Sequence, residues 1–335
     1  MSSSSAAITE NQSASASTSA SASSATSATT TTTKKTKKQV TDVSDIGSFF
    51  RTSTRNENDA TNNVREKVLK LICNPPKEYL DNAEFGNSWR IVYEAWNDAL
   101  KKIAEETSVP IYTSTQNKVR GGRKFNYDAD VLYYNGTILV ANRKIEFKNG
   151  GSNIGDLPQF LSLPAKIGLF PETYDKYWYD NYLDEYIACD SSITEAKPSI
   201  QLYLKNVTST KYTITPFFAQ LKTRELFFKK EKNEVVNASI TDYLTKYGKE
   251  LDIKSFSEKV KATQTEKIYL LWCNGKFNSD KMSEAEMSDM TYHSIKNGNV
   301  LEVKSGNTIY GLLLRWRNHK GILNPAWQIS MKRQL

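Results

Sequence analysis

Two carboxylates and a lysine lie close to an Asn-Gly turn in the first half of the 335-residue chain. Asn135-Gly136 separates two runs of strand-forming residues, which is the strongest short signal for a β-hairpin. Glu146 and Lys148 are two residues apart on the second run, so their side chains point to the same face of a strand. Asp130, at the start of the first run, would pair across the hairpin near them. Carboxylate oxygens suit Mg²⁺, and a lysine beside such a metal can orient or deprotonate a water molecule.

The hairpin resembles the active-site motif of the PD-(D/E)XK nuclease superfamily, whose fold is called restriction-endonuclease-like. The family motif is an aspartate, a hairpin and then Asp/Glu-x-Lys, and Asp130, Glu146 and Lys148 match it. Ala129 precedes the aspartate, where the family motif has proline. Asp128 is a rival for the metal-binding role, but we prefer Asp130 because it leads straight into an apolar run, as the family aspartate usually does. The alternative interpretation is a solvated hairpin with ordinary surface charges.

The resemblance also implies roles for residues outside the hairpin. The first core helix of the family often lends an acid to the metal site, and the apolar spacing predicts such a helix over 89–106. Glu94 is the candidate acid, with Asp98 behind it, and the alternative for each is an ordinary solvated helix face. Many family members carry a glutamine in the helix after the Glu-x-Lys strand. Gln159 matches that position, in a helix that Asp156 would cap.

Composition narrows the chemistry further. The formal net charge of +8 favours an anionic partner, nucleic acid first. Only two histidines are present, so a two-histidine metal site or a Ser-His-Asp arrangement has little to draw on. The three cysteines have no metal-ligand spacing, which indicates free thiols in a reducing compartment. Hydrolysis should therefore run on carboxylates with Mg²⁺, or with Mn²⁺ as the alternative.

Clustered cations are the candidates for DNA contact. Four surround a Gly-Gly turn just upstream of the hairpin, and two share one face of a C-terminal strand. These residues are Lys118, Arg120, Arg123, Lys124, Arg315 and Arg317. Arginine is well suited to bidentate contact with phosphate or guanine. The alternative for the Gly-Gly loop is a solvated basic loop.

The first 63 residues form a distinct segment. They begin with a Ser-, Ala- and Thr-rich stretch that cannot bury enough apolar surface to fold, so we expect a disordered tail and a linker. Ile46, Phe49 and Phe50 stand in the linker and resemble the PCNA-interacting box, although Val43 replaces its glutamine. The resemblance implies a one-turn 3₁₀ plug that binds a sliding clamp. The alternative is a short arm that packs its aromatic residues onto the protein's own domain.

Residues 64–335 should form one domain. We expect an α/β fold with a restriction-endonuclease-like core: a mixed central sheet flanked by helices, with C-terminal additions. Strands are predicted at 109–115, 200–205, 212–220 and 268–273, and helices at 64–73 and within 240–260. The polar N-terminus and the lack of a long apolar run predict no secretory signal and no membrane span. An intracellular location, nuclear or in a viral replication compartment, is expected.

The function that the resemblance implies is an Mg²⁺-dependent endonuclease that hydrolyses phosphodiester bonds in DNA. Two alternatives stay open. One is a non-catalytic DNA-binding adaptor whose nuclease-like core is structural, and the other is a nuclease directed at RNA. Cleavage of DNA and RNA substrates in the presence of divalent metal would separate the three.

Overall fold

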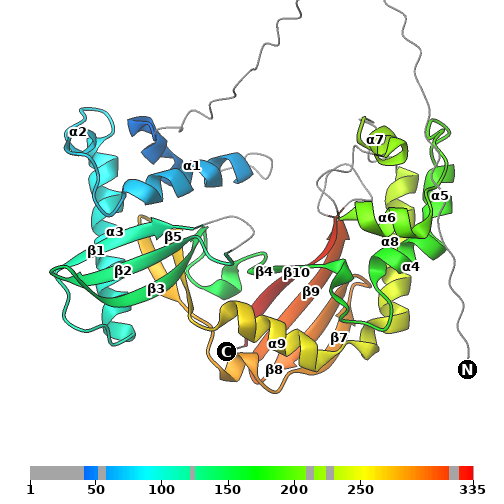
Figure 1. Ribbon diagram of the computed structural model, residues 1–335. Helices are drawn as coiled ribbons and strands as arrows, with labels where there is room; N and C mark the ends of the chain where they lie inside the picture. Colours follow the sequence, from blue (N-terminus) through cyan, green and yellow to red (C-terminus); the bar gives the residue numbers. More distant parts are fainter. Residues whose placement is uncertain are drawn as a thin grey trace, which may run out of the picture. The chain divides into compact units, whose positions relative to one another are not determined.

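Two five-stranded β-sheets organise the described chain, and the fold is mixed α/β as the sequence predicts (Figure 1). The structure is a computed structural model that describes residues 41–51, 58–120, 125–208, 215–223, 230–316 and 324–334. These residues belong to one unit that begins at Thr41. The predicted disordered tail lies outside the described residues. In the part that is described, no helix is long and apolar enough to cross a membrane.

The first sheet carries the predicted hairpin. Its strands, in spatial order, are β1 (Ser114–Val119), β2 (Ala129–Asn135), β3 (Ile138–Asn149), β5 (Lys267–Cys273) and β6 (Lys276–Asp280). The predicted hairpin is present, but Asn135 ends β2 and pairs with Ile138, so Gly136 and Thr137 make the turn, and Gly136 adopts the left-handed φ of 61° that such a turn requires. The continuous apolar run at 268–273 is confirmed as a buried strand, and it pairs in parallel with β3. The sheet is therefore mixed, as expected.

Helices and an N-terminal arm cover one face of this sheet. They are η1 (Val43–Phe49), α1 (Asn58–Leu71), α2 (Lys77–Leu80) and α3 (Gly86–Glu106). The apolar residues of α3 recur every three or four positions, so they form one buried stripe: Trp89, Val92, Trp96, Leu100 and Ile103. This stripe shares a core with Val131, Ile145 and Leu270 of the sheet.

The second sheet is antiparallel throughout and is larger than the expected C-terminal additions. Its strands, in spatial order, are β4 (Leu161–Pro164), β10 (Pro325–Arg333), β9 (Thr308–Trp316), β8 (Val300–Ser305) and β7 (Thr291–Lys296). Buried positions alternate along β8 and β9, and they join a second core. The helices of this part are η2 (Ile154–Asp156), η3 (Ala165–Ile167), α4 (Tyr174–Asn181), α5 (Leu183–Ala188), α6 (Ile200–Val207), α7 (Pro216–Thr223), α8 (Lys230–Tyr247), η5 (Gly248–Glu250), α9 (Ile253–Gln264) and η6 (Ala285–Met287).

Several predicted elements are wrong in type or position. The segment at 200–205 is helix α6, not a strand, because Tyr203 and Val207 are four residues apart and bury one helical face. The described part of the predicted strand at 212–220 is helix α7. The helix expected around Gln159 does not form, because this segment becomes β4 and pairs with β10. The first strand begins at Ser114 rather than Val109.

The N-terminal arm at 41–51, which the sequence assigns to a linker, is part of the folded unit. Ile46 is 0% exposed and Phe49 is 3% exposed, whereas Phe50 is 48% exposed. The indole N–H of Trp272 donates to the backbone oxygen of Phe49 at 2.7 Å, and that of Trp89 donates to the oxygen of Val43 at 2.8 Å. The predicted 3₁₀ turn is present as η1, but its burial favours the packing-arm interpretation over a free clamp-binding motif.

Candidate active site

A β-bulge in the hairpin decides which aspartate faces Glu146. Tyr134 pairs with Leu139 but Tyr133 pairs with Ala141, so one extra residue of β3 shifts the ladder. Beyond the bulge Ala129 pairs with Ile145, and Asp128 therefore comes opposite Glu146. The backbone N–H of Phe147 donates to Asp128 Oδ2 at 2.8 Å, which holds this carboxylate against β3.

Asp130, the aspartate preferred from the sequence, has a different role. It pairs with Lys144 rather than with Glu146, and its side chain is 1% exposed. Arg120 Nε makes an ion pair with Asp130 Oδ2, and Asn142 Nδ2 donates to Asp130 Oδ1 at 3.3 Å. One oxygen of Asp130 is ion-paired with Arg120 and the other accepts from Asn142, whereas Asp128 lies opposite Glu146, so the geometry favours the rival Asp128 as the metal-binding candidate.

Glu146 lies between two lysines. Lys148 Nζ is 2.5 Å from Glu146 Oε1, and Lys267 Nζ is 3.5 Å from Glu146 Oε2. Lys267 is the first residue of β5, and the parallel register pairs Lys144 with Lys267 and Glu146 with Tyr269, so these side chains share one face. The sequence analysis missed Lys267. The apolar run that follows it indicated the strand, but nothing local to that run indicated its neighbour.

The electrostatics of the site follow from its burial. Burial, and next the charge of Glu146, raise the pKa of Asp128 to about 6. Burial lowers the pKa of Lys148, but the charge of Glu146 and its hydrogen bond outweigh it, so that pKa is raised and the ammonium form is kept. For Lys267 burial prevails over the attraction of Glu146, and its pKa is lowered.

Glu66 on α1 is a candidate for an acid that a helix adds to the site. Its charge contributes to raising the pKa values of both Asp128 and Lys148. Glu94 on α3 is exposed and is not among the main causes of either pKa shift. Asp98 is also exposed, and its Oδ1 lies 3.7 Å from Lys101 Nζ. The ordinary solvated face is thus the better interpretation of these two acids.

The described side chains at the site offer two carboxylates to a magnesium ion and no third acidic, histidine or cysteine ligand. Within the described ranges, no three His, Cys, Asp or Glu side chains are arranged to hold a metal. Asp128 and Glu146 offer two carboxylates on adjacent strands. Mg²⁺ is commonly held by one or two protein carboxylates, with water and substrate phosphate as its other ligands. The residues fit an ion of this kind that is completed by substrate.

Of the remaining candidate residues, the described ones do not gather at one place. Gln159 is half-buried before β4, and its neighbour Phe160 offers a backbone oxygen 3.4 Å from the Tyr269 hydroxyl on the site face. Lys118 is exposed on β1, and Arg315 lies on β9 of the second sheet. Arg123, Lys124 and Arg317 lie outside the described residues. The structure therefore brings Lys118 and Arg120 near the site and places Arg315 on another sheet.

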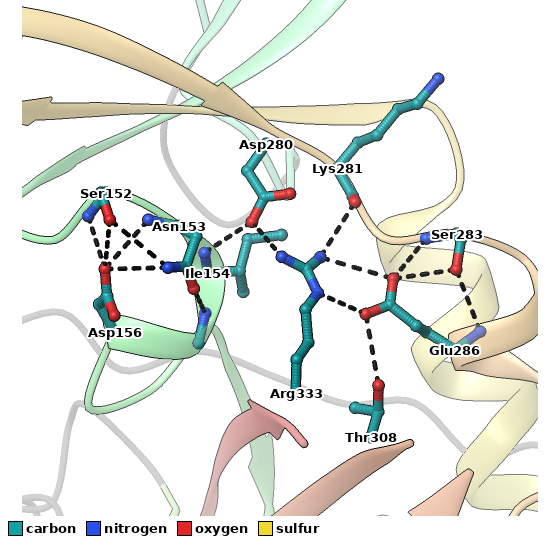
Figure 2. Close-up of polar contacts among 11 residues, drawn as sticks. Ser152, Asn153, Ile154, Asp156, Asp280, Lys281, Ser283, Glu286, Thr308 and Arg333 are labelled. Carbon is teal, nitrogen blue, oxygen red and sulfur yellow. Dashed lines mark hydrogen bonds and ion pairs between the residues drawn. The ribbon is translucent and has the colours of Figure 1, made fainter. Parts of the chain in front are cut away.

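The loop that follows Lys148 is held by a polar network that joins the two sheets (Figure 2). Asp280 Oδ2, at the end of β6, accepts from the Ile154 N–H at 2.8 Å and from Arg333 Nη1 at 2.7 Å. Arg333 Nε, at the end of β10, donates to Glu286 Oε1 at 2.6 Å. Because Asp280 contacts both partners, the loop is fixed to each sheet a few residues beyond the catalytic candidates.

Comparison with known proteins adds no assignment. A scan against protein-family models and searches of curated proteins and of solved structures found no match to this chain.

Proposed function

We propose that the protein is a metal-dependent nuclease that hydrolyses phosphodiester bonds in DNA, on a restriction-endonuclease-like core. The observation that carries the proposal is the group formed by Asp128, Glu146 and Lys148 on one face of a mixed sheet. The parallel pairing of β3 with β5 supports the family resemblance, because it completes the expected core after a long insertion. The net charge of +8 supports an anionic substrate.

Each residue has a role in this proposal. Asp128 and Glu146 would hold the metal ion, which, when bound, would polarise the scissile phosphate and lower the pKa of an attacking water. Lys148 would orient that water and stabilise the charge that develops on the phosphate. Lys267 would act through Glu146 by fixing the second carboxylate oxygen. Binding of a sliding clamp through this arm would require Ile46 and Phe49 to leave the core.

A substrate panel tests the proposal. Linear, circular, branched and single-stranded DNA and matched RNA are incubated with Mg²⁺ or Mn²⁺, or with chelator. We expect metal-dependent cleavage of DNA that Glu146→Gln and Lys148→Met abolish, while DNA binding persists. Asp128→Asn should also abolish cleavage. DNA binding without cleavage would instead support the adaptor alternative, and cleavage of RNA alone the RNA-directed one.

A matched pair of variants tests whether Asp128 or Asp130 is the metal ligand. Asp130→Asn removes one charge of a buried ion pair and leaves Arg120 without its carboxylate. Breaking such a pair costs about 3–5 kcal/mol of stability. We expect Asp130→Asn to lower the melting temperature and Asp128→Asn to abolish cleavage without that loss. The opposite pattern would restore Asp130 as the metal ligand.

A further inference from the structure

A groove is lined by residues of α1, α3, the edge strand β1 and the β2–β3 hairpin. Its volume is about 1000 Å³. Among the residues that line it are Lys70, Tyr93, Lys101, Tyr112, Gln116 and Tyr134. No aspartate or glutamate is among the described lining residues. The groove is thus cationic and polar, with aromatic rings in its walls.

The tyrosines and lysines of the groove are placed to meet a ligand. Lys70 and Lys101 are exposed, and the three tyrosines are half-buried, so part of each ring is accessible. Tyr112 is held by an edge-to-face contact with buried Tyr133, with ring centroids 4.9 Å apart. A fixed aromatic ring beside an ammonium group is the combination that binds single-stranded nucleic acid, since bases stack on the ring and phosphates attract the cation.

Strand β1 connects the groove to the candidate active site, since its residues Ser114–Asn117 line the groove and Arg120 lies just beyond its end at Val119. On α1, Lys70 follows Glu66 by four residues, so the two side chains lie on the same face of the helix. Gln116 and Lys118 lie on one face of β1. Just beyond the strand, the backbone N–H of Arg120 donates to the backbone oxygen of Asp128 at 2.7 Å. Gln116 and Arg120 are about 13 Å apart at the usual rise of a strand. A hydrogen bond connects β1 to α1, because Asn117 Nδ2 donates to the backbone oxygen of Leu69 at 3.0 Å.

We infer that this groove binds a single-stranded segment of the DNA substrate, next to the bond that is cut. The inference rests on the proposed nuclease function and deepens it by naming the substrate class: DNA in which a single strand flanks the cleavage point. The bases lie against Tyr93, Tyr112 and Tyr134, and the phosphates lie near Lys70 and Lys101. The absence of acids among the described lining residues favours this occupant, because an acidic wall would repel phosphates.

Binding without cleavage is the direct test. Fluorescence anisotropy with chelator present measures the affinity of the full chain for a labelled oligothymidylate and for a blunt duplex of equal length. Lys70→Glu combined with Lys101→Glu should weaken oligothymidylate binding about tenfold or more and reduce its salt dependence. Lys249→Glu combined with Lys254→Glu is the matched control, because it makes the same charge change at exposed lysines elsewhere in the chain. The control should bind within about twofold of the wild type, since its lysines contact no bound strand.

Aromatic stacking is tested separately from charge. Tyr93→Ala should weaken oligothymidylate binding about tenfold, and Tyr93→Phe should keep the wild-type affinity, because only the ring is needed for stacking. Equal melting temperatures of the two variants exclude a folding defect. With the cleavage-competent chain and metal, a duplex with a single-stranded flank should be cut faster than a blunt one.

The outcomes separate this inference from the proposed function. Unchanged oligothymidylate affinity in the lysine and tyrosine variants overturns the inference, as does tighter binding of the blunt duplex by the wild type. Groove-dependent binding of oligothymidylate without any cleavage supports the groove and overturns the nuclease. Glu146→Gln should keep the oligothymidylate affinity, because its carboxylate is not part of the groove.

Discussion

At the scale of single residues, the candidate site consists of three half-buried charged side chains, Asp128, Glu146 and Lys148, and the buried Lys267, which restrain one another. Glu146 is held by two lysines, and Asp128 is held by a backbone N–H. Burial of an ionised carboxylate lowers the stability of the fold unless a cation neutralises its charge. This makes the group a candidate for metal binding and gives it measurable effects on stability.

Asp128→Asn should stabilise the metal-free protein at pH 7.5. The pKa of Asp128 is raised from 3.8 to about 6, so the folded state favours the protonated carboxyl and loses stability as pH rises through about 6. Asparagine cannot ionise, and the gain should be about 1–3 kcal/mol at pH 7.5 and close to zero at pH 4. Urea unfolding at both pH values measures it.

The exposed residue Asp98 provides the control for this prediction. Asp98→Asn should show no such gain at pH 7.5, because its carboxylate is in solvent. Added Mg²⁺ should raise the melting temperature of the wild type and have little effect on Asp128→Asn. Equal stability of Asp128→Asn and wild type at pH 7.5 would contradict a buried, charged Asp128.

Lys267→Met should lower kcat while KM for DNA stays near its wild-type value. Lys267 is 5% exposed and its ammonium group makes an ion pair with Glu146 Oε2. Without this ion pair the Glu146 carboxylate can move away from the position that the reaction needs. A small displacement of such a group costs about tenfold to a hundredfold in rate. Steady-state kinetics on one DNA substrate gives both constants.

Two further variants distinguish positioning by Lys267 from a folding role. Lys267→Arg should recover part of kcat, because it restores a cation beside Glu146. Lys276→Met, at an exposed lysine of β6, should behave as wild type. Lys267→Met should keep its stability, because burial disfavours the charge of Lys267 and the half-buried Glu146 keeps its ion pair with Lys148. A parallel loss of stability and rate would indicate a structural lysine.

At the scale of elements, the site depends on a bulge and on a pairing between distant strands. The Asn-Gly signal and the apolar run at 268–273 are local, and both were predictable from the sequence. The bulge beside Tyr133 has no comparable local signal, and without its extra residue Asp128 would face Ile145 rather than Glu146. The register of β3 with β5 arises only when residues far apart in the chain pack together. For this reason the sequence alone indicated neither the place of Lys267 beside Glu146 nor that of Asp128 opposite Glu146.

Local signals were also overruled elsewhere. Around Gln159, a potential cap and a proline in the first turn favoured a helix. The segment forms β4 instead, because β10 offers it a strand edge and buries Leu163. The sequence also did not indicate Glu66 on α1. Amphipathic spacing identifies the buried stripe of a helix, but not which of its charged residues lies near a distant strand.

Glu66→Gln tests the contribution of α1 to the site. The charge of Glu66 helps to raise the pKa of Asp128, so its removal should bring that pKa below about 6. NMR titration of the Asp128 carboxyl carbon would show the shift. Activity at limiting Mg²⁺ should fall several-fold, because one negative charge no longer attracts the ion.

Glu94→Gln is the matched control on α3. It should change neither the titration of Asp128 nor the activity, because Glu94 is exposed and is not among the main causes of the raised pKa of Asp128. An effect of Glu94→Gln as large as that of Glu66→Gln would return the role to α3.

At the scale of the whole molecule, segments far apart in the chain converge on the first sheet. The network around Arg333 ties the last strand to the loop after Lys148, and the N-terminal arm inserts Phe49 among Phe147, Trp272 and Phe277. Both ends of the described chain therefore support the hairpin that carries the candidate site.

Phe49→Ala should destabilise the protein by about 3–5 kcal/mol, as the truncation of a buried phenylalanine does. Phe49 is 3% exposed and contacts three aromatic rings. Phe50→Ala is the neighbouring control: Phe50 is 48% exposed, and its removal should cost less than about 1 kcal/mol. Denaturant unfolding of both variants gives the comparison. If Phe49→Ala were as stable as wild type, the arm would not be part of the core, and Ile46, Phe49 and Phe50 would again be free to bind a sliding clamp.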